Sequence, residues 1–143
     1  MNNLNPLKKD KDAMRDKYKK LRLELSSEER KKKDADIVNA ALSLASYRYA
    51  EYVLLYAACE GEINIDELAL AALKKGKKVA FPRCIKQNHV MNYHIITSLD
   101  ELSVDSYGIR EPSGELEIYD PEKNTGSAIC FVPGLVYDNN GYR

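Results

Sequence analysis

The stretch YVLLYAACEGEINIDELALAALKKGKKVAFPR, residues 52–83, decides the fold of this chain. It opens with a continuous apolar run at 52–58, which has the length of a buried strand, and it ends with a second such run at 79–82. Between these runs, apolar residues recur at helical spacing over 66–75, and Gly76 follows where a helix C-cap belongs. A strand, a helix and a second strand in this order predict a parallel βαβ unit.

Two later segments extend this unit into a sheet. Residues 91–96 (MNYHII) alternate enough to form a strand near an edge, and residues 127–132 (SAICFV) form another buried run. We therefore expect an α/β fold, a three-layer sandwich with a mostly parallel sheet and helices on both faces. The 143 residues contain no internal repeat or linker, so we expect a single domain over 1–143. Ligands of such folds bind at the carboxyl ends of the strands.

Two helices are predicted before the βαβ unit. The first, at about 8–25, carries an apolar stripe at spacings of four, three and four residues. The second, at about 26–46, begins with Ser26 and Glu29, the two residues of a capping box. The basic run at 30–33 suits RNA binding in charge, but it has no interleaved aromatic residues, so we interpret it as a solvated helix face.

The formal net charge of zero conceals an uneven distribution, with a basic N-terminal region and an acidic C-terminal third. Lys11 and Arg15 lie four residues apart on the first predicted helix and therefore share one face. Such a pair suits a polyanion such as a triphosphate, because arginine offers a planar fork and lysine a point charge. From spacing alone, the alternative is that both residues belong to the solvated side of the helix.

Cysteine usage and composition are typical of a cytoplasmic globular protein. Apolar residues make up 44% of the chain, but no apolar run approaches the roughly 20 residues of a membrane span or the length of a signal peptide. Cys59, Cys84 and Cys130 are odd in number and far apart, so we expect reduced thiols in the core. Without a C-x-x-C pair, zinc is not expected, and His94 is predicted to be a packed or surface histidine.

Polar residues follow the predicted strands at the edge where ligands bind. Glu62 comes just after the first strand and Arg83 just after the second. A carboxylate there suits a cationic or N–H-rich ring, and an arginine suits an anion, although both could be plain surface residues. The loop at 133–143 adds further polar side chains on a backbone that glycine allows to approach a ligand.

Taken together, these segments resemble the 5-formyltetrahydrofolate cyclo-ligase family, also called methenyltetrahydrofolate synthetase. The resemblance runs from Lys11 to Arg143, and its order and spacing are more specific than any single motif. Its marks are KDAMR (11–15), SSEER (26–30), YAACEGEINID (56–66), GKKVAFPR (76–83), MNYHI (91–95), GIREP (108–112) and VPGLVYDNNGYR (132–143).

The resemblance implies the same fold and an ATP-dependent closure of 5-formyltetrahydrofolate to 5,10-methenyltetrahydrofolate, with ADP and phosphate as the other products. Its implied cofactors are ATP and Mg²⁺, and its implied substrate is a small molecule. We expect no nucleic-acid or membrane partner, and a monomer or weak homodimer. Phosphoryl transfer fits such residues, because it requires mainly positioning and charge stabilisation from the protein.

The family's functional residues are carried over by position. Lys11 and Arg15 match its N-terminal ATP-contacting pair, Glu62 matches the glutamate that binds the folate, and Ala57 falls at a nearby substrate contact. The matches to the first part of the family's nucleotide loop are Asn140, Gly141, Tyr142 and Arg143. The resemblance assigns no catalytic residue and no magnesium ligand here.

In the family, the arginine that matches Arg143 is followed by a glycine-rich run of the type LGxGxGYYD, which supplies backbone N–H groups to phosphate. On this basis we expect that the chain lacks the C-terminal part of the family domain and is either a fragment or a shortened, inactive form. Two alternatives of other classes are a non-catalytic folate- or nucleotide-binding relative and a small nucleic-acid-binding module.

Overall fold

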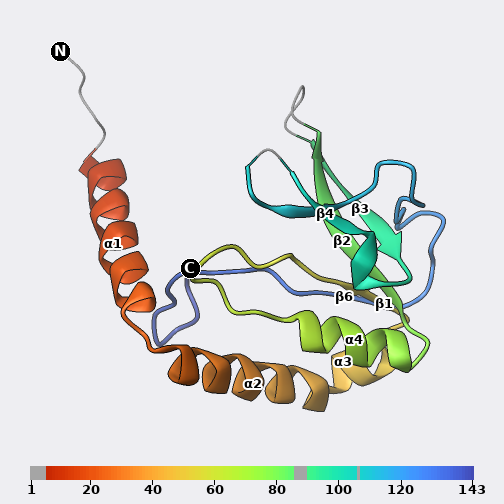
Figure 1. Cartoon of the computed structure of the whole chain (residues 1–143), viewed down its shortest axis with the longest axis horizontal. Coiled ribbons are helices and arrows are strands. Elements are labelled where there is room, and N and C mark those ends of the chain that lie inside the picture. Colours follow the sequence, from red (N-terminus) through yellow and green to blue (C-terminus); the bar gives the residue numbers. More distant parts are fainter. Residues whose placement is uncertain (1–5, 86–89, 106) are drawn as a thin grey trace.

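The computed structural model describes residues 6–85, 90–105 and 107–143 and has a central four-stranded sheet of order β3-β2-β1-β6 (Figure 1). The strands are β1 (Tyr52–Leu54), β2 (Lys78–Ile85), β3 (Val90–Ile96) and β6 (Ala128–Cys130). β1 runs parallel to both β2 and β6, and β3 runs antiparallel to β2. The prediction of an α/β fold with a mostly parallel sheet is confirmed.

Local sequence signals set the helix ends. The helices are α1 (Pro6–Leu23), α2 (Ser27–Ser43), α3 (Ala45–Tyr49) and α4 (Asp66–Lys74), and a single 3₁₀ turn, η1, covers Leu99–Glu101. Before α2, the Ser26 hydroxyl accepts from Glu29 N–H while the Glu29 carboxylate accepts from Ser26 N–H, so the predicted capping box is confirmed. Gly76 adopts φ 74° just after α4, a conformation that glycine takes without strain.

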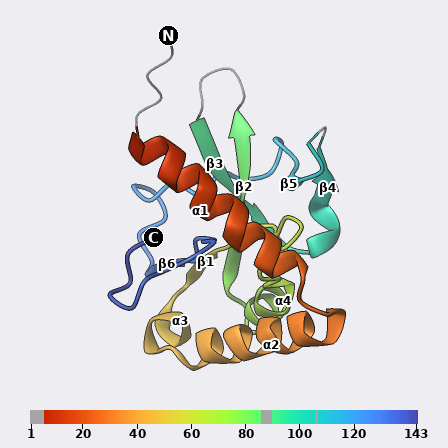
Figure 2. The ribbon, with the colours of Figure 1, turned by 90° about the vertical axis from the view of Figure 1, so that its left-hand side faces the viewer.

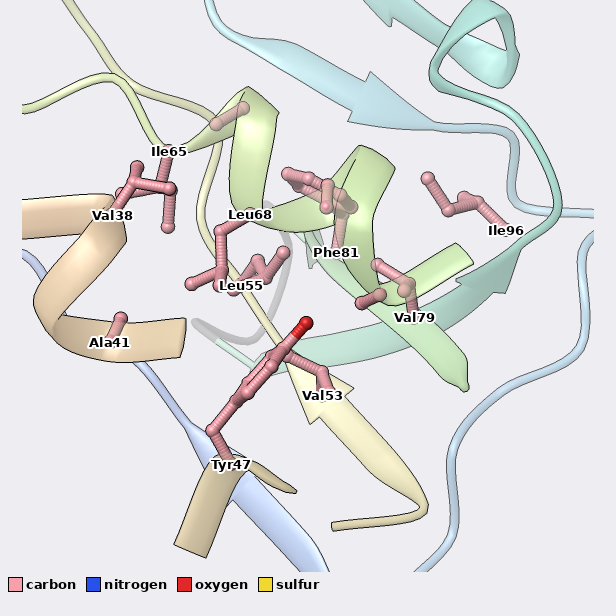
Figure 3. Packing of buried hydrophobic residues seen from close by; sticks show 13 residues of the cluster. Val38, Ala41, Tyr47, Val53, Leu55, Ile65, Leu68, Val79, Phe81 and Ile96 are labelled. Atoms are coloured by element: carbon pink, nitrogen blue, oxygen red, sulfur yellow. The ribbon is translucent and has the colours of Figure 1, made fainter. Parts of the chain in front are cut away.

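The hydrophobic core lies between one face of the sheet and three helices (Figure 3). Val53, Val79 and Ile96 lie side by side in register across β1, β2 and β3, and all three are almost fully buried. The helices α2, α3 and α4 cover this face with a shared set of buried residues, namely Val38, Ala41, Tyr47, Leu68, Ala69 and Ala72. Burial of this apolar surface is the main stabilising term of the fold.

The opposite face of the sheet differs from the expected helix layer. The strand β5 (Arg110–Pro112) pairs antiparallel with β4 (Leu102–Val104). Within the described ranges, the segment that follows β5 covers the opposite face of the sheet. In this segment the Tyr119 ring lies 5.1 Å from that of Tyr52, and the Asn124 side-chain amide donates to the Tyr52 hydroxyl at 3.3 Å. The helices α2, α3 and α4 therefore pack on one face, and coil covers the other.

Two strand lengths differ from the prediction. β1 ends at Leu54, four residues before the end of the apolar run, and β2 continues through Pro82 to Ile85. Leu55 N–H donates to Ala80 O, so the backbone groups of Ala80 and Pro82 face the β1 side of β2. Since β1 has ended at that level, Pro82 removes no ladder hydrogen bond from the sheet.

The cysteine prediction is wrong in one respect. Cys59, Cys84 and Cys130 are free thiols, as expected, but all three are exposed rather than in the core. Beside Cys130, Ile129 and Phe131 pack against the core instead, because successive residues of an extended chain alternate in direction. His94 is packed as predicted, with 3% exposure and Nδ1 2.9 Å from Leu116 O. In the described part of the chain, no helix has the length and apolarity of a membrane span.

Candidate functional site

Two adjoining hollows lie at the carboxyl ends of β1 and β6, where the sequence predicts a ligand cleft. The α2 cleft has a volume of about 460 Å³ and lies between Arg30, Lys33 and Ile37 of α2 and the loop after β6. The α1 cleft has a volume of about 490 Å³ and lies beside Arg15, Lys19 and Arg22 of α1. Both are lined by Arg22, Gly61, Glu62, Pro133 and Gly134, so they form one divided site.

Glu62 occupies the wall shared by the two clefts. It follows Gly61, whose φ of 80° turns the chain after β1 and favours glycine. Cys59 N–H donates to the Glu62 carboxylate at 2.9 Å and orients it, and Glu62 N–H donates to Cys59 O at 3.0 Å and closes the backbone turn. Partial burial, with the Glu62 charge as a second cause, raises the pKa of the Cys59 thiol and keeps it protonated near neutral pH.

Tyr56 also stabilises the turn that contains Glu62. Its hydroxyl donates to Ile63 O at 2.9 Å, which ties the residue after Glu62 to the end of β1. Burial, together with the negative charge of Glu62, raises the pKa of Tyr56 to about 12. The phenol is therefore a neutral hydrogen-bond donor across the physiological pH range.

Arg22 joins three segments that are distant in sequence. From the last turn of α1, its guanidinium donates to Gly61 O at 3.3 Å and also to Gly134 O. The first bond holds the Glu62 turn and the second holds the loop after β6. Figure 1 shows α1 apart from the body of the molecule along most of its length, and in Figure 2, seen from that side, the helix crosses in front of the sheet. The C-terminal end of α1 is therefore its attachment.

The loop after β6 brings Tyr137 against Gly134. A Cβ atom added at Gly134 would lie 2.0 Å from the Tyr137 hydroxyl oxygen, so the close approach requires glycine. Tyr137 is half exposed, and it lines the α2 cleft. The absence of a side chain at Gly134 therefore lets the phenol ring form part of the cleft wall.

A tight turn follows this loop at the predicted nucleotide segment. Asp138 organises it, because its carboxylate accepts 2.9 Å bonds from Asn140 N–H and Tyr142 N–H. Gly141 adopts φ 84°, and its N–H donates to Asp138 O at 3.0 Å. Arg143 donates from its guanidinium to Pro133 O at 3.3 Å, which brings it back to the loop that lines both clefts.

The structure brings together only some of the predicted site residues. Arg15 lines the α1 cleft and forms a 3.1 Å ion pair with Asp12, while Glu62 lines both clefts. Lys11 is exposed and lies on the same face of α1, one turn further out, and lines neither cleft. Ala57 is 6% exposed and packs in the hydrophobic core, so its side chain faces away from both clefts.

The terminal residues predicted to bind nucleotide are exposed and line neither described cleft. The group comprises Asn140, Gly141, Tyr142 and Arg143. Of these residues, Arg143 bonds directly to the loop after β6, which lines both clefts. Their backbone N–H groups are engaged by Asp138 at Asn140, Gly141 and Tyr142.

Sequence reasoning missed several cleft residues. We interpreted the run at 30–33 as a solvated face, but Arg30 and Lys33 line the α2 cleft together with Ile37. The signal was present, because these three residues are three and four positions apart and share one helix face. Arg22 had no comparable signal, since its role depends on contacts between distant segments. Tyr137 belongs to the loop at 133–143, whose polar side chains were predicted to contact a ligand, and it lines the α2 cleft. Arg83 is structural, as its guanidinium donates to Pro112 O at 2.7 Å.

The described residues bring few metal-ligating side chains together. Among the described residues, no group of three or more histidine, cysteine, aspartate or glutamate side chains could hold a metal ion. Magnesium differs from zinc here, because it usually keeps several waters and is held by one or two carboxylates and the phosphates of a nucleotide. Glu62 is the carboxylate that both clefts share.

A mostly parallel sheet with a charged cleft at the carboxyl ends of its strands is typical of α/β proteins that bind small ligands at a sheet edge. Cations of α1 and α2 line these clefts together with the carboxylate of Glu62 and, in the α1 cleft, that of Glu60, an arrangement that suits an anionic ligand that also carries hydrogen-bond donors. Comparison with known proteins identifies the family within this class.

Residues 7–143 match the model of the 5-formyltetrahydrofolate cyclo-ligase family, and the chain belongs to this family. A probable 5-formyltetrahydrofolate cyclo-ligase of Schizosaccharomyces pombe is 30% identical over 104 residues, covering 71% of this chain and 50% of that protein. Another, of Caenorhabditis elegans, is 22% identical over 143 residues, covering 98% of this chain and 69% of that protein.

A solved structure is similar as well. The NMR structure of Aquifex aeolicus 5,10-methenyltetrahydrofolate synthetase superposes with a TM-score of 0.79 at 30% sequence identity. The match covers 93% of this chain and 65% of that one. The chain thus spans half the length of the S. pombe relative and about two thirds of the other two.

Proposed function

We propose that this chain provides the ligand-binding part of an enzyme that closes 5-formyltetrahydrofolate to 5,10-methenyltetrahydrofolate at the expense of ATP, a step of one-carbon folate metabolism. The observation that carries the proposal is Glu62 on the wall between two cationic clefts. A reaction in which the folate takes the γ-phosphoryl group of ATP needs two adjoining ligand sites. The family membership and the printed names of the relatives support the same reaction.

The chemistry requires little covalent participation by the protein. The formyl oxygen attacks the γ-phosphorus, and the bond from this phosphorus to ADP breaks. N10 of the folate then attacks the activated formyl carbon, the carbon–oxygen bond to phosphate breaks, and N10 loses its proton. The protein contributes orientation of the two substrates and stabilisation of the charge that moves to ADP.

Each cleft suits one substrate. The α1 cleft presents Arg15, Lys19 and Arg22 along one helix face, and these cations suit the triphosphate. Lys11 extends the same face outward. Glu62 accepts hydrogen bonds from the N–H groups of the pterin ring, which places the ring at the boundary between the clefts. We carry Ala57 over from the family as a weaker contact, acting through its backbone, because its side chain packs in the core.

Asn140, Gly141, Tyr142 and Arg143 are proposed to approach the nucleotide from the far side of the α1 cleft. Arg143 is the member best placed for this role, through the loop it shares with both clefts. When bound, Mg²⁺ would neutralise phosphate charge. We place the reaction in the cytoplasm, where the three free thiols would stay reduced. We also propose a monomer or weak homodimer with a small-molecule substrate and no nucleic-acid or membrane partner.

The test follows product formation by its near-ultraviolet absorbance, with 5-formyltetrahydrofolate, ATP and magnesium. Both this chain and the longest polypeptide encoded by its reading frame are assayed. Glu62→Gln and Arg15→Ala are expected to lower kcat/KM at least about a hundredfold and about tenfold, respectively. The matched controls are Glu24→Gln and Lys20→Ala, which change the same charges outside both clefts.

Two outcomes separate the proposal from its alternative. Binding of folate or nucleotide without turnover in either polypeptide would favour a non-catalytic binding relative. Turnover that survives Glu62→Gln unchanged would remove Glu62 from the site and with it the structural support for the proposal.

A further inference from the structure

The first helix, α1, carries an apolar stripe that is largely open to solvent. None of its residues from 8 to 23 is buried, and Met14 and Leu21 are 53% and 48% exposed. Met14, Tyr18 and Leu21 follow one another at spacings of four and three residues, which places them on one face of the helix. Apolar residues at this spacing are the anchors with which an amphipathic helix docks into a groove.

This stripe is separate from the face of α1 that enters the α1 cleft. Arg15, Lys19 and Arg22 line that cleft, and each of them follows a stripe residue by one position. One residue turns a helix by about 100°, so the two faces point in different directions. The helix can therefore bury its stripe against another surface while its three cations stay in the cleft.

A third hollow, the α2–α4 groove, has the shape to receive such a helix. Its volume is about 570 Å³, and its described lining residues come from α2, from α4 and from Asn64 just before α4. The α2 wall comprises Lys31, Ala35, Val38 and Leu42 at spacings of four, three and four residues, a length of about 16 Å. The stripe on α1 fits within this length.

The charges of the groove complement those of α1. The groove is lined by Asp34, Asp66 and Glu67 and by one basic residue, Lys31. Arg110 neutralises Asp66 through a 2.8 Å ion pair, and the other two carboxylates leave the rim acidic on balance. In contrast, residues 8–22 contain eight basic and three acidic side chains. Opposite charges on two facing surfaces favour their encounter and fix their relative orientation.

The helix and the groove of one molecule lie far apart. Arg22 holds the C-terminal end of α1 through its bonds to Gly61 O and Gly134 O. Figure 1 shows α1 rising from one end of α2, while α4 lies near the other end. The stripe can reach its own groove only if the bonds of Arg22 break, whereas the groove of another molecule is accessible to it.

From this complementarity we infer that α1 of one copy docks in the α2–α4 groove of a second copy, and that α1 of the second copy docks in the groove of the first. The exchange is reciprocal and closes after two copies, so it produces a dimer and no larger species. A contact made by one short stripe on each side is small, and small interfaces belong to weak complexes. The inference specifies the interface of the weak homodimer proposed above and does not depend on the reaction.

The experiment measures molecular mass by sedimentation equilibrium over about 1–200 μM protein, with the longest polypeptide encoded by the reading frame. The wild type is expected to show a monomer–dimer equilibrium. Met14→Glu places a charge in the stripe and Ala35→Arg fills the groove, so each should raise the dimer Kd at least about tenfold. The matched controls are Ala13→Glu on α1 and Ala40→Arg on α2, which lie outside all three hollows and should retain the wild-type Kd.

Mixing the two interface variants tests the pairing of helix with groove. Met14→Glu keeps an intact groove and Ala35→Arg keeps an intact helix, so a mixture of the two can form one of the two contacts. We therefore expect a heterodimer in the mixture under conditions in which each variant alone is monomeric. All four substituted residues are exposed, and circular dichroism should show the same fold in every variant.

A wild type that is monomeric up to about 200 μM would overturn the inference, because the stripe and the groove would then have no second copy as a partner. Species larger than a dimer would overturn the reciprocal exchange. A mixture that stays monomeric, or controls that weaken the dimer as much as the interface variants, would assign the dimer to another surface. The readout is mass alone, so a failure of the proposed reaction would leave this test unaffected.

Discussion

Replacement of Arg22 by alanine is the most informative perturbation, because this side chain holds α1 and both cleft loops. The variant loses two hydrogen bonds from a charged donor, to Gly61 O and Gly134 O. Such bonds contribute about 1.5–3 kcal/mol each when fully buried, but the partly exposed carbonyls regain water, so we expect about 1.5 kcal/mol in total. For a chain of this size, that lowers Tm by about 3–6 °C.

The assay is urea unfolding followed by circular dichroism, combined with limited tryptic digestion. Lys20→Ala on the same helix is the matched control, since it removes one basic residue that lines neither cleft. Most of the stability of a helix in a protein comes from tertiary packing, and none of the residues 8–23 of the 18-residue helix α1 is buried, so loss of its attachment should expose it to protease. If the two variants agreed within about 0.5 kcal/mol and were digested at the same rate, Arg22 would not be the attachment of α1.

Three other changes test separate parts of the structure. Gly134→Ala should displace the Tyr137 ring, because the new Cβ would lie 2.0 Å from its hydroxyl oxygen. We expect the free energy of unfolding to change by less than about 1 kcal/mol. Folate binding, measured by calorimetry, should weaken as much as in Tyr137→Ala. Tyr56 has a pKa raised to about 12 from 10.0, so the unfolded state ionises first and the wild type should lose stability as pH rises from 10 to 12. Tyr56→Phe should unfold about 1 kcal/mol more easily at neutral pH, through loss of the bond to Ile63 O, but show a flatter alkaline profile; an unchanged slope would contradict the raised pKa. Phe81→Ala, at a fully buried position, should cost about 3–5 kcal/mol in urea unfolding, and a cost below about 1 kcal/mol would remove Phe81 from the core.

Features fixed by neighbouring residues were predictable from the sequence. The capping box of Ser26 and Glu29 and the C-cap at Gly76 depend on a few consecutive residues, and both are present. The parallel order of β1 and β2 follows from the crossover helix between them. The length of β1 was not predictable, because an apolar run records burial and does not record where pairing stops.

Features formed by distant segments were not readable in the same way. Arg22 and Gly134 are 112 residues apart in sequence, and nothing in either local pattern indicates their bond. The positions of Arg30 and Lys33 in the α2 cleft could have been predicted, because both lie on the same helix face as the apolar residue Ile37. Ala57 was predicted to be a site residue only because it matches a family position. Its side chain is buried in the core, so a matching position in the sequence does not determine the direction of the side chain.

The pairing of β1 with β6 makes both clefts depend on a contact between distant segments. The Ser127 hydroxyl donates to Tyr49 O across 78 residues, and β6 adds to the sheet beside β1, which positions the loop that lines both clefts. The contacts of β1, β2 and β3 with one another are more local in sequence, so they can form before β6 docks. The clefts are complete only after β6 has docked. A ligand that needs the completed clefts therefore stabilises the docked state, and its concentration sets how much of the protein is docked.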